Sequence, residues 1–455
     1  MDRIVAGIEL GEEKLRVAVA RHRPGSTRML TGIEATSAGI EDQTVVDAND
    51  LADALAGISR KLRTSVDFPL ENVIFVVPTG QIQFHETEAS LRPSGSRGTV
   101  VEADGDRLVE KSRPAFPHND RHLIHVIPQA YSLDGKETER LPVGKTGQDL
   151  RVFSMSVSCE ADTAARIHEA AQLVGSDRVA LMAGPVAESH AALTETERQR
   201  GAAVLSIGER MSTITVMHYG HYLGSAKIGI GAQHFTNDLS IALDLPYPTA
   251  KAVLEQVAIF SNNVGPSRAE ITVADEGIDI DRVEMVATLR DRAEELFSLT
   301  ETAIESIAGD RELPGGLAIA GQPILRDGLS QLGRSAISMP IHWAAPRGIE
   351  GIPLAISGNA AWVPAIGTLI WAGAIEDPLA HPSFHSEPRR KSGGILSPWR
   401  RLTGKFGGRN GTKPSSTETS ETSSDHKSER AARRKNASVA PGTGKRERSR
   451  EIARV

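Results

Sequence analysis

Three histidines, His118, His122 and His125, come closest in their spacing to a metal site. On a helix, intervals of four and three residues would gather their imidazoles on one face, where they could bind zinc. Residues 123–127 read Leu-Ile-His-Val-Ile, however, which is the pattern of a strand and brings no carboxylate ligand with it. We therefore expect no metal at these histidines.

Other reactive side chains narrow the chemistry further. Cys159 is the only cysteine among 455 residues, which excludes an internal disulfide and a cysteine-based zinc cluster and fits a reducing cytoplasm. No order of Ser, His and Asp along the chain identifies a catalytic triad. No run of 18 apolar residues exists, so we expect no membrane-spanning helix.

Charge divides the chain into an acidic body and a basic end. Residues 1–386 carry 34 Lys+Arg against 51 Asp+Glu, a net charge of −17, whereas residues 387–455 carry 18 against 7, a net charge of +11. An acidic body is a poor partner for nucleic acid, which we therefore exclude as a partner. The basic end suits anionic membrane lipids.

A short amphipathic segment occupies residues 394–406. Ser397 is placed as an N-cap, and Trp399, Leu402 and Phe406 fall within about 60° of one another around a helix, with cations on the flanks. This pattern is typical of a helix lying in a membrane interface, although a surface helix packed on its own body is the alternative. The predicted membrane-binding residues are Ile395, Leu396, Trp399, Arg400, Arg401, Leu402, Lys405 and Phe406.

Composition separates this segment from its surroundings. Residues 377–393 form a linker rich in Pro, His and Ser, and residues 407–455 contain no Phe, Trp or Tyr. Such a tail buries too little apolar surface to offset its ordering entropy, so we expect it to be disordered.

The rest of the chain alternates strands and helices, which indicates an α/β fold. Strand–turn–strand patterns around Gly11 and again around Gly208 indicate two related halves. Residues 81–148 break the alternation with short β-like runs and polar loops, and we interpret them as an inserted subdomain. We expect strands at 3–10, 14–20, 72–77, 202–207, 213–218, 222–228 and 317–320, and helices at 50–62, 162–174, 234–244, 248–260, 283–307 and 360–371.

Several segments together resemble FtsA, the bacterial actin-like protein that ties FtsZ filaments to the membrane. The most specific is residues 125–134, His-Val-Ile-Pro-Gln-Ala-Tyr-Ser-Leu-Asp, and Val143-Gly144, Ala183-Gly184 and Leu193-Thr194-Glu195 follow in the family's order. The resemblance spans about residues 3–373 and implies a two-lobed actin-like fold. Its domains would be a first lobe at 1–80 and 149–200, an inserted SHS2 subdomain at 81–148, and a second lobe at 201–376 with its upper subdomain at 233–312.

The resemblance also implies a nucleotide site for ATP with Mg²⁺, built from two glycine turns and an adenosine motif. Glycine matters in such turns because a side chain would block the backbone N–H groups from the phosphates. The matching positions are Gly11, Lys14, Ser206, Gly208, Glu209, Arg210, Lys251, Gly321 and Gln322.

These positions depart from the family pattern in ways that weaken phosphate binding. Glu12 and Glu13 stand in the first turn, where they repel phosphate, and the family's D-I-G-G-G-T reads Ser-Ile-Gly-Glu-Arg-Met at 206–211. The T-G-G motif reads Ala-Gly-Gln at 320–322. We expect weak or absent ATP binding and no enzymatic activity, the alternative being that Arg210 or Lys251 replaces the lost contacts as a point charge.

The function implied by the resemblance is structural. Such a protein polymerises on the inner face of the cell membrane at the division site and tethers FtsZ-like filaments through its C-terminal helix. One alternative is an adaptor like PilM, which shares the fold, serves a pilus machine and lacks the amphipathic anchor. Another is a weakly active ATPase of the same superfamily. The residues that would contact the partner carry no motif that can be matched.

Overall fold

The computed structural model describes residues 3–374, with gaps at 69, 71, 117, 119, 177, 257–267, 274–275 and 322–325. The chain divides between Thr403 and Gly404 into two units, and all described residues belong to the first. The predicted linker, amphipathic segment and tail at 377–455 therefore lie outside the described residues. Within the described ranges, no helix combines the length and apolar character needed to cross a membrane.

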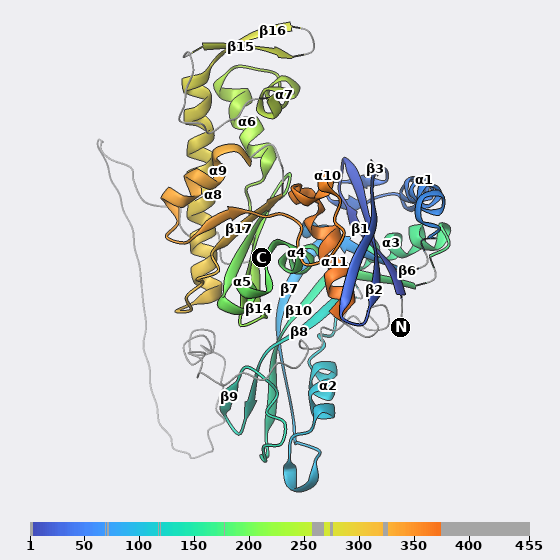
Figure 1. Ribbon diagram of the computed structural model, residues 1–455. Helices are drawn as coiled ribbons and strands as arrows, with labels where there is room; N and C mark the ends of the chain where they lie inside the picture. Colours follow the sequence, from blue (N-terminus) through green and yellow to red (C-terminus); the bar gives the residue numbers. More distant parts are fainter. Residues whose placement is uncertain are drawn as a thin grey trace, which may run out of the picture. The chain divides into compact units, whose positions relative to one another are not determined.

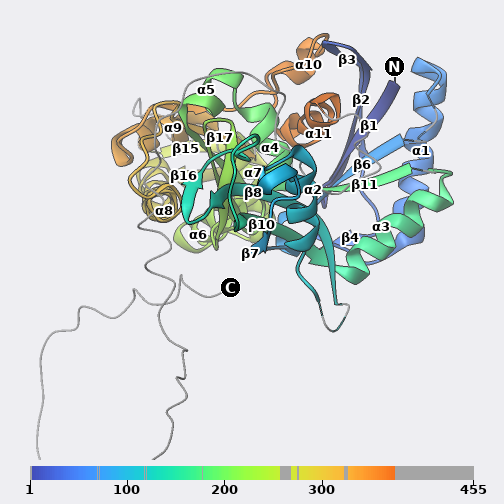
Figure 2. The same cartoon turned by 90° about the horizontal axis from the view of Figure 1, so that it is seen from below.

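A five-stranded mixed sheet forms the first lobe. Its order is β11 (Arg178–Ala183), β6 (Asn72–Val77), β1 (Arg3–Leu10), β2 (Lys14–Arg23) and β3 (Ser26–Thr36). Strands β1, β2 and β3 are antiparallel neighbours, whereas β6 runs parallel to β1 and β11 parallel to β6. Helices α1 (Ala48–Val66) and α3 (Ala161–Leu173) lie on one side of the sheet and α11 (Val363–Ala374) on the other, as Figure 2 shows.

The second lobe repeats this topology. Its sheet has the order β14 (His221–Ile228), β13 (Ser212–His218), β12 (Ala202–Ile207), β17 (Leu317–Gly321) and β18 (Ile341–Trp343), again with an antiparallel meander followed by two parallel neighbours. Two sheets of one topology confirm the expectation of related halves. Helices α8 (Arg282–Ala308) and α9 (Arg326–Ala336) pack together beside this sheet (Figure 1).

An upper subdomain extends the second lobe. It comprises α6 (Ala232–Ala242), α7 (Tyr247–Gln256) and the hairpin of β15 (Arg268–Val273) and β16 (Glu276–Asp281). Helix α8 joins it to the lobe, because its buried residues Met285 and Leu289 share one hydrophobic cluster with Phe235 of α6 and with Leu205 of β12.

The inserted subdomain has its own sheet and its own small hydrophobic cluster. The strand order is β7 (Ile82–Leu91), β10 (Leu150–Glu160), β8 (Arg121–Leu133) and β9 (Lys136–Thr138), and α2 (Glu102–Lys111) packs against it. The prediction of short β runs is wrong, since β8 has 13 residues and β10 has 11. The predicted boundary at 148 also differs from the structure, because β10 pairs along its length with β7 and β8.

Helix α4 (Gly184–Ala192) joins the two lobes and crosses α11. Gly367 of α11 permits the crossing, because a Cβ at that position would lie 1.8 Å from the carbonyl oxygen of Ala187. Buried α11 residues such as Val363 and Ile366 share the first lobe's core. The predicted second lobe, 201–376, included this helix, but its apolar side chains face the sheet of the first lobe.

Shorter elements complete the path. They are β4 (Ile40–Glu41), β5 (Thr44–Val45), α5 (Glu195–Arg200), α10 (Leu354–Ser357) and the 3-10 turns Thr79–Gln81, Ser96–Gly98 and Ala360–Trp362.

Local chemistry explains several boundaries. Asp47 caps α1 by accepting hydrogen bonds from the amides of Asn49 and Asp50, at 2.7 and 3.2 Å. Tyr219 and Gly220 both have positive φ, as a tight two-residue hairpin turn requires.

Candidate functional site

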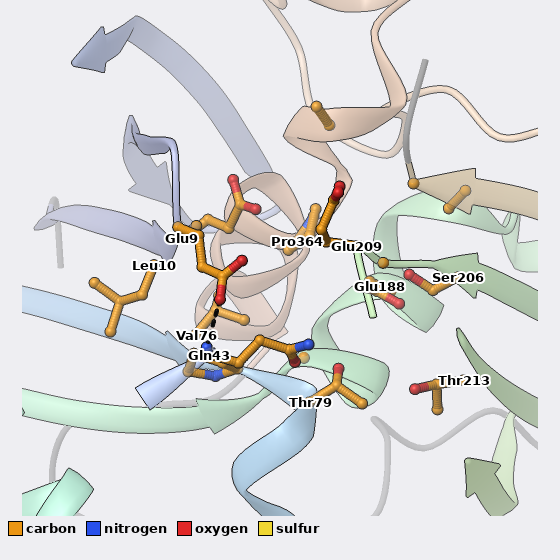
Figure 3. A pocket seen from close by; sticks show the side chains of 18 of the residues that line it. Glu9, Leu10, Gln43, Val76, Thr79, Glu188, Ser206, Glu209, Thr213 and Pro364 are labelled. Carbon is orange, nitrogen blue, oxygen red and sulfur yellow. Dashed lines mark hydrogen bonds between the residues drawn. The ribbon is translucent and has the colours of Figure 1, made fainter. Parts of the chain in front are cut away.

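A cavity of about 330 Å³ lies between the two lobes, lined by the β1–β2 turn on one side and the β12–β13 turn on the other. Helix α4 and the 3-10 turn Ala360–Trp362 contribute further lining residues. The duplicated topology explains this position, because it brings the same turn of each half to one cleft. Figure 3 shows side chains from both lobes facing this space.

Carboxylates dominate the polar lining. Five are found among the described lining residues: Glu9, Glu12, Glu13, Glu188 and Glu209. Burial raises the pKa of Glu9, although Arg16 opposes this effect. Burial also raises the pKa of Glu209, and the neighbouring Glu13 and Glu12 raise it further. The five carboxyl groups supply mostly hydrogen-bond acceptors, and the raised pKa values of Glu9, Glu188 and Glu209 show that burial and crowding favour the protonated, neutral forms of these three.

The cations of the described lining already have carboxylate partners within the first lobe. Lys14 Nζ lies 2.5 Å from Glu34 Oε1, and Arg16 lies 2.8 Å from Glu9 Oε2 and 3.0 Å from Glu34 Oε2. A phosphate entering the cavity would have to compete with these ion pairs for each positive charge.

The two cations that were weighed as substitute phosphate ligands lie at the rim and are paired as well. Arg210 Nη1 lies 2.9 Å from Asp42 Oδ1, and Lys251 Nζ lies 2.6 Å from Glu13 Oε1. Each of these ion pairs joins the second lobe to the first.

Backbone donors near the second turn are also engaged. The amides of Ala232 and Gln233, at the start of α6, donate to the carbonyl oxygens of Gly208 and Glu209, each at 2.9 Å. Thr213 is buried in the lining, where it offers a hydroxyl. The paired cations and the carboxyl groups that line the cavity therefore fit a triphosphate with Mg²⁺ poorly.

Glu188 of α4 is one of the lining residues that the sequence reasoning missed, as are Arg16 and Gln43. Its side chain is almost fully buried, and burial raises its pKa to about 8 in spite of a hydrogen bond with Ser206. Figure 3 shows it beside Ser206, at the end of β12. A glutamate in the otherwise apolar run Pro-Val-Ala-Glu-Ser-His-Ala-Ala at 185–192 was the available signal.

The structure gathers most of the predicted nucleotide positions. Gly11, Lys14, Ser206, Gly208, Glu209 and Gly321 line the cavity. Arg210 and Lys251 lie at its rim, and Gln322 lies outside the described residues. The predicted membrane-binding residues Ile395, Leu396, Trp399, Arg400, Arg401, Leu402, Lys405 and Phe406 lie outside them too.

The histidines weighed for metal take separate places. His125 of β8 is fully buried, and its Nε2 accepts a hydrogen bond from the amide of Ala183 at 3.1 Å. His122 packs near His168, with ring centroids 6.0 Å apart, and His118 is exposed. No group of three or more potential ligands that could hold a metal occurs in the described part of the chain.

The motif of residues 125–134 joins the inserted subdomain to the rest of the body. His125 reaches the start of α4 through Ala183, while Gln129 Nε2 donates to the carbonyl oxygen of Leu223 in β14 at 2.6 Å. Tyr131, in the same strand, is buried in the subdomain's own cluster. One strand thus contacts the start of α4, the second lobe and its own core.

Comparison with known proteins agrees with this architecture. A family model described as the SHS2 domain inserted in FTSA matches residues 80–158, which span β7 to β10. Among curated proteins, cell division protein FtsA of Agrobacterium fabrum is 25% identical over 426 residues, covering 89% of this chain and 92% of the relative. The same protein of Bacillus subtilis is 21% identical over 347 residues, covering 75% and 79%.

A solved structure supports the fold independently. The protein in a PilM–PilN type IV pilus biogenesis complex superimposes with a TM-score of 0.57 at 15% identity, covering 81% of this chain and 98% of that one. At this identity the similarity bears on the fold alone. With the SHS2 subdomain inserted between β6 and α3 of a duplicated two-lobed body, the chain is an FtsA-like protein of the actin fold.

Proposed function

We propose that this chain is a structural protein of cell division that polymerises on the cytoplasmic face of the membrane and tethers FtsZ-like filaments there. The observation that carries the proposal is the SHS2 subdomain inserted in an actin-fold body. The FtsA proteins are similar to this chain along most of its length. Those relatives are named for cell division, which favours this role over that of a pilus adaptor.

We also propose that the chain is not an enzyme and functions without ATP. The support is chemical: the cavity between the turns is lined by carboxylates, and its cations are held in ion pairs. A phosphoryl-transfer site instead needs free cations or a metal ion to neutralise the developing charge. The proposed role therefore depends on the membrane and the filaments that the protein binds.

Attachment to the membrane is assigned to residues 394–406. Three or four large apolar side chains, each worth about 1.5–3 kcal/mol when fully buried and less at an interface, give reversible binding by one copy. Each flanking cation adds up to about 1 kcal/mol on an anionic leaflet. Polymerisation would multiply these weak contacts into firm attachment.

Vesicle sedimentation with the full chain tests this assignment. Trp399→Glu places a charge on the predicted apolar face and should abolish binding to vesicles that contain anionic lipid. The matched control Gly404→Glu adds the same charge on the opposite side of the predicted helix and should retain most of the binding. Equal binding by wild type and Trp399→Glu would show that residues 394–406 are not the membrane anchor, and it would favour a soluble adaptor.

A further inference from the structure

The rim of the interlobe cavity holds a set of polar contacts that cross from one lobe to the other. Lys251 of α7 pairs with Glu13 in the β1–β2 turn, and Arg210 in the β12–β13 turn pairs with Asp42 between β4 and β5. A third crossing is Lys227 of β14, whose Nζ donates to the carbonyl oxygen of Gly80 at 3.2 Å.

The first-lobe ends of these three contacts are themselves connected. The amide of Gln43 donates to Glu12 Oε1 at 2.8 Å, which ties the segment around Asp42 to the turn that carries Glu13. The side-chain oxygen of Gln43 accepts from the amide of Gly80 at 3.0 Å. Three second-lobe cations therefore meet one hydrogen-bonded first-lobe edge, which runs from Glu13 through Gln43 to Gly80.

This edge borders the cavity in which a ligand shared by both turns would lie. The turns at Gly11 and Gly208 line the same cavity, so a phosphate chain held by both would join the lobes. Here the same turns provide Glu13 and Arg210 as ends of interlobe ion pairs. Opposite charges on the protein thus supply an attraction that does not depend on a ligand.

We infer that the pairs Lys251–Glu13 and Arg210–Asp42 form a latch that holds the two lobes together in place of a nucleotide. The latch rests on the proposed nucleotide independence of the cleft, but the two statements fail by different measurements. Tight binding of Mg-ATP in calorimetry would overturn nucleotide independence, whereas unchanged lobe distances after removal of the paired charges would overturn the latch.

Exposure sets the strength of the latch. The side chains of Glu13 and Asp42 are 73% and 71% exposed, and those of Lys251 and Arg210 are 31% and 47% exposed. Exposed pairs are individually weak and are screened by salt, so the latch biases an equilibrium between closed and open lobes rather than fixing one state. The closed state should lose population in high salt.

Pulsed electron paramagnetic resonance on the full chain tests the latch. Cys159 is buried, so labels can be placed on Lys61→Cys in α1 and Ile241→Cys in α6, both at exposed positions away from the rim. In this labelled chain, Glu13→Gln with Asp42→Asn removes both acidic partners with little change in shape. The open-to-closed ratio should rise roughly two- to tenfold, the range expected for two exposed pairs.

Two further variants make the result specific. Glu88→Gln with Asp149→Asn makes the same change in net charge at the partners of Arg151, which lie in β7 and just before β10 of the inserted subdomain, and should leave the distances unchanged. Glu13→Lys with Lys251→Glu reverses one ion pair and should restore the wild-type distribution to a chain that Glu13→Lys alone has opened. A latch variant with the wild-type distance distribution, or a wild type that closes only when Mg-ATP is added, would overturn the inference.

Discussion

Single side chains decide the chemistry of the interlobe cavity. Glycine at positions 11 and 208 keeps each turn tight, because a Cβ would lie 2.6 Å from the carbonyl oxygen of Lys14 or 2.8 Å from that of Met211. Glu12, Glu13 and Glu209 nevertheless fill the space beside these turns with acceptors. The sequence allowed this to be anticipated, since the carboxylates stand within the turns themselves. It did not show that Lys14 and Arg16 would pair with Glu34, because that residue comes from β3, a strand the sequence reasoning missed.

The carboxylate lining predicts weak nucleotide binding. Titration of Mg-ATP into the purified full chain should give no heat of binding at micromolar concentrations, because phosphate must displace existing ion pairs. Ser206→Asp with Glu209→Gly and Arg210→Gly should raise the affinity by removing a carboxylate and a side chain from the second turn and supplying an acid near Mg²⁺. Micromolar binding by the wild type would contradict this prediction.

Glu188 predicts a distinct dependence of stability on pH. Its pKa is about 8 in the folded chain against an ordinary value of 4.5, so the folded state holds a proton that the unfolded state releases between these values. Stability is therefore lost as the pH rises through that window. Glu188→Gln keeps a hydrogen-bonding side chain without the titration.

The comparison with wild type isolates this residue from the other acids. At pH 8 the Glu188→Gln variant should be more stable by roughly 1–4 kcal/mol, and the difference should shrink towards pH 5. Urea unfolding of both proteins across that range measures it. A stability difference that stays constant with pH would show that the buried carboxyl does not titrate as described.

The buried contact of His125 should contribute to the free energy of unfolding, because the amide of Ala183 donates to its Nε2. His125→Leu retains an apolar body of similar size but removes the atom that accepts from the Ala183 amide. We expect a loss of about 1–3 kcal/mol in the free energy of unfolding. His118→Ala, at an exposed position, should change stability by less than about 0.5 kcal/mol. Equal effects of the two substitutions would assign no role to the buried contact.

At the scale of elements, the sequence predicts best those helices and strands whose formation depends only on nearby residues. The strands at 72–77 and 202–207 coincide with β6 and β12, because short β-branched runs between turn residues are read without tertiary context. Helix α1 is likewise set by its own leucine spacing and by Asp47.

Elements defined by distant partners could not be read in the same way. Strand β10 belongs to the inserted sheet only through its pairing with β7 and β8, and α11 belongs to the first lobe only through contact with β1 and α4. Neither fact leaves a trace in local periodicity. The cavity residues were found by resemblance to a family motif, which is why Glu188, outside any motif, was missed.

The crossing of α4 and α11 predicts a sharp contrast between two glycines. Gly367→Ala would place a Cβ against the backbone of Ala187, so the helices must separate, at a cost of about 1–3 kcal/mol. Gly57→Ala in α1 meets nothing within 4 Å and should stabilise by about 0.5–1 kcal/mol through helix propensity. Thermal unfolding of both variants distinguishes them, and a neutral Gly367→Ala would contradict the close crossing.

At the scale of the whole molecule, the chain has an acidic body and a basic C-terminal part, which differ in the charged surfaces they can bind. Residues 1–386 have a net charge of −17 and residues 387–455 a net charge of +11, so attraction to an anionic surface belongs to the C-terminal part. In this account the interlobe ion pairs favour the closed arrangement of the lobes without a ligand, and weak membrane contacts gain strength from many copies. Both features suit a scaffold rather than a catalyst.

The position of the chain in dividing cells of its native host tests this account most directly. A fluorescent fusion of the full chain should form a band at the division site, because the proposed membrane binding and filament recruitment would both act there. A fusion that lacks residues 394–406 should be diffuse while remaining folded. A full chain that is diffuse, or that gathers away from the division site, would contradict the proposed role.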